Sequence, residues 1–66
     1  MELEITKVTE EQAQKIMLER VPLGLFYCPI KIDGERAYIG IDNACGESWS
    51  EAFKTLRACK RWLNRL

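Results

Sequence analysis

The chain has 66 residues, of which 47% are hydrophobic and 30% are charged, and its formal net charge is zero. A chain of this size forms one small domain, here residues 1–66, and buries only about 60% of the surface that the unfolded chain exposes. This composition argues against a disordered chain and leaves little room for a deep catalytic pocket. No apolar run reaches the roughly 20 residues that a membrane span needs.

The cysteines indicate a reducing compartment. Cys28, Cys45 and Cys59 share no close spacing, and their odd number leaves at least one unpaired. The first ten residues, MELEITKVTE, are acidic and lack the apolar segment of a signal peptide. We therefore expect free thiols in a cytoplasmic protein.

A short edge strand is expected over residues 1–6, which alternate polar and apolar, and a helix over residues 10–20. Thr9 suits the N-cap, and Gln12 three residues later completes a capping box. Pro22 stops the helix, because the residue before a proline is pushed out of the α region. The apolar stripe of the helix consists of Ala13, Ile16, Met17 and Val21.

The following segment, LGLFYCPIKIDGERAYIGIDN, predicts a β-hairpin. Asp33-Gly34 between alternating apolar residues is typical of a type I′ turn, which needs positive φ at both positions. With that turn, one side of the hairpin carries the opposed pairs Ile30 and Ala37, Cys28 and Ile39, and Phe26 and Ile41. The other side carries Leu25, Tyr27, Pro29 and Tyr38, with Lys31 opposite Arg36.

A third antiparallel strand is predicted over residues 47–53. A three-residue loop, residues 44–46, with Gly46 in the left-handed conformation would place Trp49 opposite Ile41 and Phe53 opposite Ala37, so that both rings enter the core. Glu51 conflicts with this register, because it would share the buried side. A loop one residue longer or shorter would expose Trp49 instead.

Thr55 is expected to cap a last helix over residues 56–65, with Leu56, Cys59, Trp62, Leu63 and Leu66 on its apolar face. The predicted fold class is α+β: a helix, a three-stranded antiparallel meander and a second helix, with an extra N-terminal edge strand in one version. Because each helix has one apolar stripe, both are expected on the same face of the sheet.

Two surfaces are candidates for binding. The sheet face left open by this arrangement, with Leu25, Tyr27 and Tyr38, is expected to bind another protein or a second copy of the chain; ordinary exposure of strand tyrosines is the alternative. The basic face of the last helix is the candidate for nucleic acid, or else a solvated face. It consists of Arg57, Lys60, Arg61 and Arg65.

Catalysis and metal binding are not expected. The chain has no histidine, which excludes Cys–His and Ser–His nucleophiles, and it has no phosphate-binding glycine motif. Asp42, Asn43, Glu47 and Glu51 lack the spacing of a calcium loop, and the first two are expected to hydrogen-bond the turn. We therefore predict a non-enzymatic protein without cofactor or metal.

The C-terminal part of the chain resembles a group of small uncharacterised proteins of Gram-positive bacteria, their phages and integrated elements. The shared pattern is Ile-Asp-Asn, a Gly-Glu, Trp-x-Glu-x-Phe, and a helix with Cys and Trp-Leu. Its members here are Ile41, Asp42, Asn43, Gly46, Glu47, Trp49, Glu51, Phe53, Cys59, Trp62 and Leu63. The resemblance implies a phage or mobile-element setting and no particular activity. Ala44 departs from the Ser or Thr of that pattern.

Overall fold

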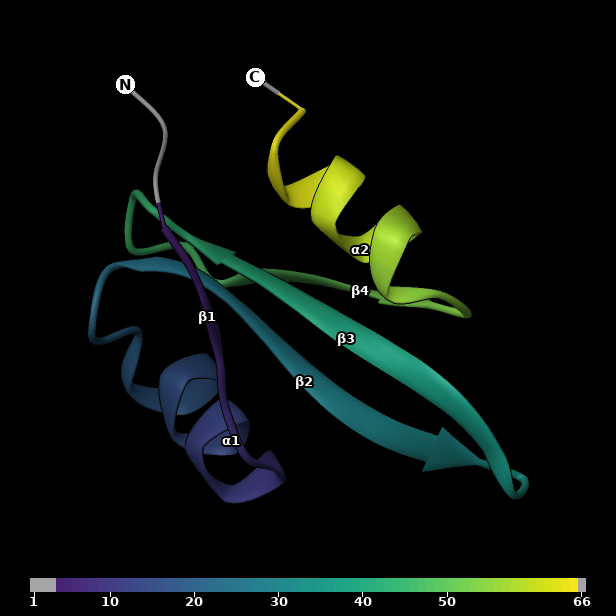
Figure 1. Cartoon of the computed structure of the whole chain (residues 1–66). Helices are drawn as coiled ribbons and strands as arrows, with labels where there is room; N and C mark the ends of the chain where they lie inside the picture. The colour runs from purple at the N-terminus through teal and green to yellow at the C-terminus, as the bar shows by residue number, and fades with distance from the viewer. Residues whose placement is uncertain (1–3, 66) are drawn as a thin grey trace.

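The structure is a computed structural model that describes residues 4–65, arranged as a mixed β-sheet with a helix on each face (Figure 1). In chain order the elements are β1 (Ile5–Lys7), α1 (Glu10–Glu19), β2 (Gly24–Ile32), β3 (Glu35–Asn43), β4 (Trp49–Phe53) and α2 (Leu56–Leu63). The sheet order is β1-β2-β3-β4; β1 is parallel to β2, and the other neighbours are antiparallel. The predicted α+β class is confirmed. Among the described residues, no helix is long and apolar enough to cross a membrane.

Helix α1 begins as predicted. The Gln12 N–H donates to Thr9 Oγ1 at 3.1 Å, and the Thr9 N–H donates to Gln12 Oε1 at 2.9 Å, so the capping box is complete. The helix ends at Glu19, one residue before the predicted end, because Arg20 takes the left-handed conformation with φ 59°. There its N–H still donates to the Ile16 carbonyl at 2.8 Å.

The expected N-terminal strand is present as β1, and it is parallel to β2. Ile5 pairs with Leu25, and the Val8 N–H extends the contact by donating to the Tyr27 carbonyl at 2.9 Å. Leu3, which was expected in this strand, lies outside the described residues. The parallel pairing makes α1 the crossover of a β–α–β unit, and such a crossover must lie against one face of the sheet.

The β2–β3 hairpin has the predicted register at every position. Phe26 pairs with Ile41, Cys28 with Ile39, and Ile30 with Ala37. Asp33 and Gly34 have φ of 52° and 80°, as a type I′ turn requires.

The predicted register of β4 is wrong by one residue. Ser50, and not Trp49, pairs with Ile41, and the Trp49 side chain is 61% exposed. Gly46 does have positive φ, 80°, but the pairing places one more residue between β3 and β4 than expected, which is the alternative that exposes Trp49. Glu51 now pairs with Gly40 on the opposite face and is exposed, which removes the conflict noted above.

Hydrogen bonds of two buried polar residues, Asn43 and Ser48, hold β4 in this register. The side chain of Asn43 is fully buried; its Oδ1 accepts from the Ser48 N–H at 3.1 Å, and its Nδ2 donates to the Pro22 carbonyl at 2.8 Å. The Ser48 hydroxyl lies 2.9 Å from Asn43 Oδ1 and 3.1 Å from the Ile16 carbonyl. Because Ser48 is drawn inward by these partners, the next residue, Trp49, points out of that side of the sheet.

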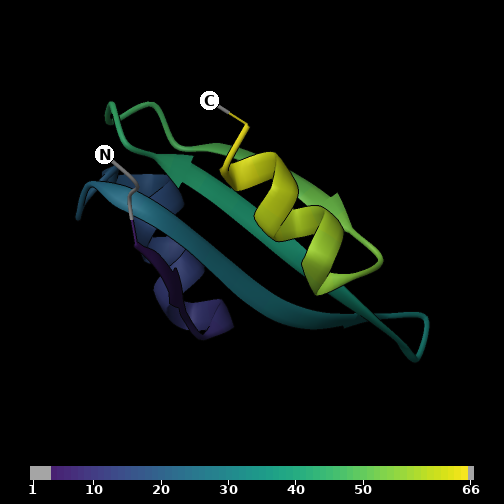
Figure 2. The same cartoon turned by 45° about the horizontal axis from the view of Figure 1, so that its top comes forward.

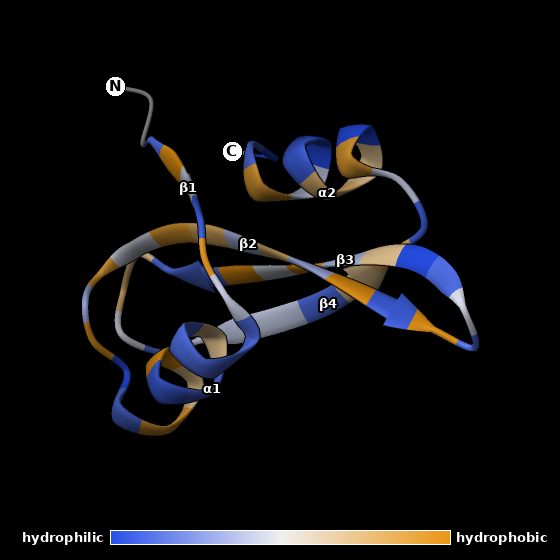
Figure 3. Cartoon of the chain, turned by 60° about the horizontal axis from the view of Figure 1, so that its bottom comes forward, coloured by the Kyte–Doolittle hydropathy of each residue, from blue (hydrophilic) through white to orange (hydrophobic). Residues whose placement is uncertain are grey.

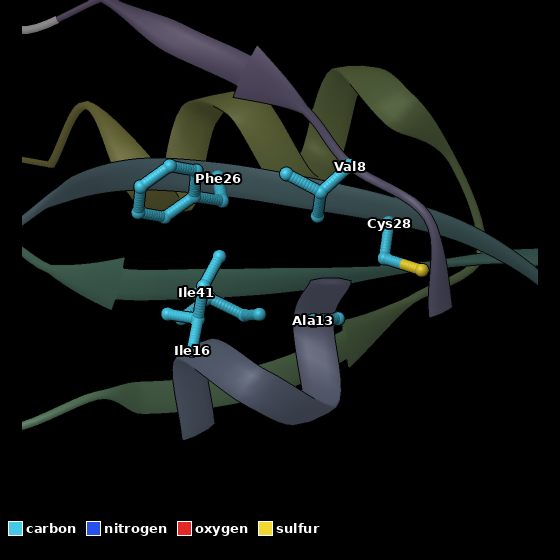
Figure 4. Packing of buried hydrophobic residues seen from close by; sticks show 6 residues of the cluster. All are labelled: Val8, Ala13, Ile16, Phe26, Cys28 and Ile41. Carbon is cyan, nitrogen blue, oxygen red and sulfur yellow. The ribbon is translucent and has the colours of Figure 1, made fainter. Parts of the chain in front are cut away.

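The prediction that both helices cover one face is also wrong. Figures 2 and 3 show α1 and α2 on opposite sides of the sheet. Residues on α1 and on the α1 face of the sheet form one core cluster, whose packing is shown in Figure 4: Val8, Ala13, Ile16, Phe26, Cys28 and Ile41. A second cluster lies under α2 and centres on Leu25, Cys59 and Leu63. Both faces of the hairpin are apolar, so each can bury a helix.

Helix α2 begins at the predicted cap, where Thr55 Oγ1 accepts from the Ala58 N–H at 3.1 Å, and ends at Leu63, two residues before the predicted end. It lies directly over Gly40 in β3. A Cβ on Gly40 would lie 3.1 Å from both Cys59 Sγ and Trp62 Cε3. The Trp62 ring also packs on Phe53, with ring centroids 5.6 Å apart. A larger residue at this position would force the neighbouring side chains to move by a few tenths of an ångström, so glycine favours this close approach of helix and strand.

Candidate functional sites on the two faces of the sheet

The sheet face predicted to be open is covered by α2. Leu25 is only 5% exposed and belongs to the core with Cys59 and Leu63, so it is not available to a partner as predicted. Tyr27 and Tyr38 are half-buried and pack against the same cluster. The prediction that this face is open is therefore wrong, because α2 covers it. Part of each tyrosine nevertheless remains accessible.

The four cations assigned to the basic helix face are divided between different surroundings. Arg57 and Arg61 are exposed. Arg65 lies beyond the end of α2, where its Nη2 bonds Asp42 Oδ2 at 3.0 Å and its guanidinium stacks 4.3 Å from the Trp62 ring. Lys60 lies on the sheet side, with Nζ 5.9 Å from the centroid of Tyr27. The predicted nucleic-acid face is thus not one continuous set of free cations.

Tyr27, beside which Lys60 lies, lines a hollow at the turn end of the hairpin. This tyrosine hollow has a volume of about 670 Å³ and wraps around the free edge of β2. It is lined by Lys7, Glu10, Tyr27, Pro29, Ile30, Lys31, Arg36, Ala37, Tyr38 and Leu56. The structure therefore brings together the two predicted tyrosines and the Lys31–Arg36 pair predicted on the same side, with Lys60 of the predicted basic face beside Tyr27. Lys7 was not expected there.

A second hollow, the α1 groove, lies on the opposite face. Its volume is about 520 Å³, because α1 packs mainly on β2 and leaves the β3–β4 half of this face uncovered. One wall is the flank of α1, where Leu18 is 84% exposed. The lining is Glu10, Ala13, Gln14, Met17, Leu18, Cys28, Ile30, Ile39, Ile41 and Ser50. It is largely apolar, and sequence reasoning missed it because both helices were assigned to this face.

The thiols do not have the surroundings of catalytic nucleophiles. Burial raises the pKa of Cys28 above its ordinary value of 9.0, and the nearby Glu10 carboxylate raises it further. Burial also raises the pKa of Cys59, against a smaller opposite effect of the Lys60 ammonium. Cys45 is exposed, and all three are free, as predicted. A raised pKa keeps the buried thiols protonated at neutral pH and so unreactive.

The polar residues near the β3–β4 loop have structural partners. Asp42 Oδ1 accepts from the Ala44 N–H at 3.3 Å, which confirms the expected turn bond. Glu47 Oε2 accepts from Trp49 Nε1 at 2.8 Å, while Glu51 lies apart on β4. Within residues 4–65 no three Cys, Asp or Glu side chains gather in a way that could hold a metal ion.

The chain matches no protein-family model, no curated protein and no solved structure. The two hollows are therefore the features from which a function can be argued. The resemblance to small phage and Gram-positive proteins stays a prediction.

Proposed function

We propose that this protein is a non-enzymatic interaction module that associates with a second copy of itself through the α1 groove. The observation that carries the proposal is the exposure of Leu18, 84%, on the wall of an apolar groove. A contiguous apolar patch of this kind on a small domain marks an interaction site. The proposal keeps the predicted self-association and moves it from the tyrosine face to the opposite one.

The groove and its wall are both apolar and lie side by side. The flank of α1 projects Met17 and Leu18, and the space beside it is floored by Ile39 and Ile41. When two copies meet about a two-fold axis, the α1 flank of each lies in the groove of the other. One patch then supplies both halves of the contact, as a symmetric dimer interface requires.

Charge along α1 favours the same arrangement. Its first turn carries Glu10 and Glu11, its last residue is Glu19, and its C-cap residue is Arg20. A two-fold axis perpendicular to the helices makes the two copies of α1 antiparallel. The acidic first turn of each helix then lies toward Arg20 of the other, and the helix dipoles oppose one another.

The absence of histidine from the chain and the raised pKa values of the buried thiols support a binding role without catalysis. The proposal keeps the predicted phage or mobile-element setting and the predicted cytoplasmic location. Self-association of this kind requires no cofactor. A partner of different sequence in the same groove is the competing occupant.

Sedimentation equilibrium of the native protein and of Leu18→Glu tests the proposal. We expect a dimer of micromolar affinity, and we expect Leu18→Glu to weaken it by at least about 10-fold, because a charge would enter an apolar contact twice per dimer. Leu18 is so exposed that the substitution leaves the monomer fold intact; its circular dichroism and unfolding midpoint check this.

Leu23→Glu is the matched control. Leu23 is also a well-exposed leucine, 63%, but it lies outside the groove, so the same substitution should leave the dimer unchanged. A native protein that stays monomeric at millimolar concentration contradicts the proposal. Equal weakening by both substitutions also contradicts it, because the contact would then not be centred on the groove.

A further inference from the structure

Three cations line the tyrosine hollow and a fourth lies beside it, each from a different element. Lys7 of β1 is paired with Tyr27, and Lys31 and Arg36 occupy opposed positions on β2 and β3. Lys60 of α2 has its ammonium 5.9 Å from the Tyr27 centroid. The strand register places Lys7, Lys31 and Arg36 on the α2 face of the sheet with Tyr27 and Tyr38.

The positive charges of these side chains repel one another, and no ion pair with them is found among residues 4–65. Lys31 and Arg36 are directly opposite one another, and like charges in this position destabilise an antiparallel pair. Within residues 4–65 the ion pair of the structure is Arg65 with Asp42, and none of the four cations has a carboxylate within 4.0 Å. Glu10 lines the hollow but forms no ion pair with them. Unpaired cations opposed in this way suit an anionic ligand.

The hollow also offers aromatic rings and hydroxyl groups. Tyr27 and Tyr38 are half-buried, so their rings are held by the core while part of each remains accessible. Pro29 is paired with Tyr38 across the hairpin. Rings held in place next to cations are the combination that binds single-stranded nucleic acid, where bases stack and phosphates are neutralised.

The dimensions favour a single strand over a duplex. A volume of about 670 Å³ lies in the range of small-molecule sites. Such a hollow admits one or two unstacked nucleotides, whereas a duplex would rest on its rim and leave the rings unused.

We propose that the tyrosine hollow binds single-stranded nucleic acid, with Lys7, Lys31, Arg36 and Lys60 contacting phosphates and the two tyrosines contacting bases. The site differs from the basic helix face predicted from the sequence, because it excludes Arg57, Arg61 and Arg65. It also differs from the dimer contact, which is centred on Leu18, although Glu10 and Ile30 line both hollows.

Fluorescence anisotropy of a labelled oligothymidylate tests this site, with Lys31→Glu as the principal variant. The substitution replaces the opposed cations with an attractive Glu–Arg pair, so we expect the unfolding midpoint to stay the same or rise. Binding should nevertheless fall by at least about 10-fold at low salt. For the native protein, four phosphate contacts predict a slope of log affinity against log salt of about −3.

Three comparisons decide the outcome. Arg61→Glu makes the same charge change on the outer side of α2 and should alter affinity by less than about 2-fold, and Tyr38→Leu should weaken binding by about 10-fold through lost stacking. Leu18→Glu should bind like the native protein, which separates this site from the dimer. The proposal is overturned if the native protein does not bind oligothymidylate at low salt, or if Lys31→Glu and Arg61→Glu lose equal affinity for it. It is also overturned if a duplex or polyglutamate binds as tightly as the single strand.

Discussion

The two faces of the sheet are covered to different extents, although each receives one helix of similar length. On the α2 face, Gly40 lets the helix approach closely, and Cys59 and Leu63 are buried to 0% and 2% exposure. On the α1 face, the helix packs on β2 and leaves Ile39 only half-buried beside an open groove. A helix therefore covers a sheet face fully only where the two surfaces fit closely, as under α2. Under α1 the fit is less close, and an apolar surface remains open to a partner.

The largest effect is expected at the junction of the loop with α1. Asn43→Ala leaves the Pro22 carbonyl and the Ser48 N–H without their partners in a buried place. Each unsatisfied group costs about 1–3 kcal/mol, so we expect a loss of about 3 kcal/mol in the free energy of unfolding. Urea unfolding measures it, and Asn64→Ala, at an exposed asparagine, should change stability by less than about 0.5 kcal/mol. A loss below about 1 kcal/mol for Asn43→Ala would mean that these bonds do not hold the register.

A substitution at Gly40 tests how closely the α2 face is packed. Gly40→Val introduces a Cβ 3.1 Å from Cys59 Sγ and Trp62 Cε3, and overpacking of this kind costs about 2 kcal/mol. The control is Ala52→Val, on the neighbouring strand but facing the open α1 side, which should be neutral or slightly stabilising because valine favours strands. Thermal unfolding of both variants makes the comparison. If Gly40→Val were as neutral as Ala52→Val, α2 would not lie on β3.

The smallest effect is expected at Trp49. Because its side chain is 61% exposed, Trp49→Ala should cost less than about 1 kcal/mol, whereas removing a buried tryptophan costs about 3–5 kcal/mol. Trp62→Ala, which removes the ring packed on Phe53, should cost distinctly more. Urea unfolding of the two variants sharpens the assignment of the β4 register. A larger loss for Trp49→Ala than for Trp62→Ala would instead support the register in which Trp49 lies in the core.

The parts of the fold that could be predicted from the sequence are those set by local chemistry. Thr9 with Gln12, Asp33 with Gly34, and Thr55 act through bonds and dihedral angles within a few residues, so their helices and turn were placed within one or two residues. The β3–β4 loop was not, because its length depends on the bonds of Ser48 to Asn43 and to the distant Ile16 carbonyl.

The sides of the helices depend on tertiary packing, yet the sequence carries two signals for them. The apolar runs LFYCPI and AYIGI are nearly continuous, which is typical of strands covered on both faces. A glycine inside a strand, here Gly40, indicates close approach of another backbone or side chain. The α1 groove could be inferred only after α2 was placed on the other face. Lys31 and Arg36 followed from the predicted hairpin register, whereas Lys7 joins them only because β1 pairs with β2.

Both proposals depend on the helices lying on opposite faces, and nuclear Overhauser effects at Trp62 measure this most directly. We predict strong effects between the Gly40 α-protons and the ring proton on Trp62 Cε3, together with upfield-shifted Gly40 resonances, and none between Trp62 and Ile41 or Phe26. Contacts of the Trp62 ring with Ile41, and none with Gly40, would place α2 beside α1 and contradict the structure and both sites built on it.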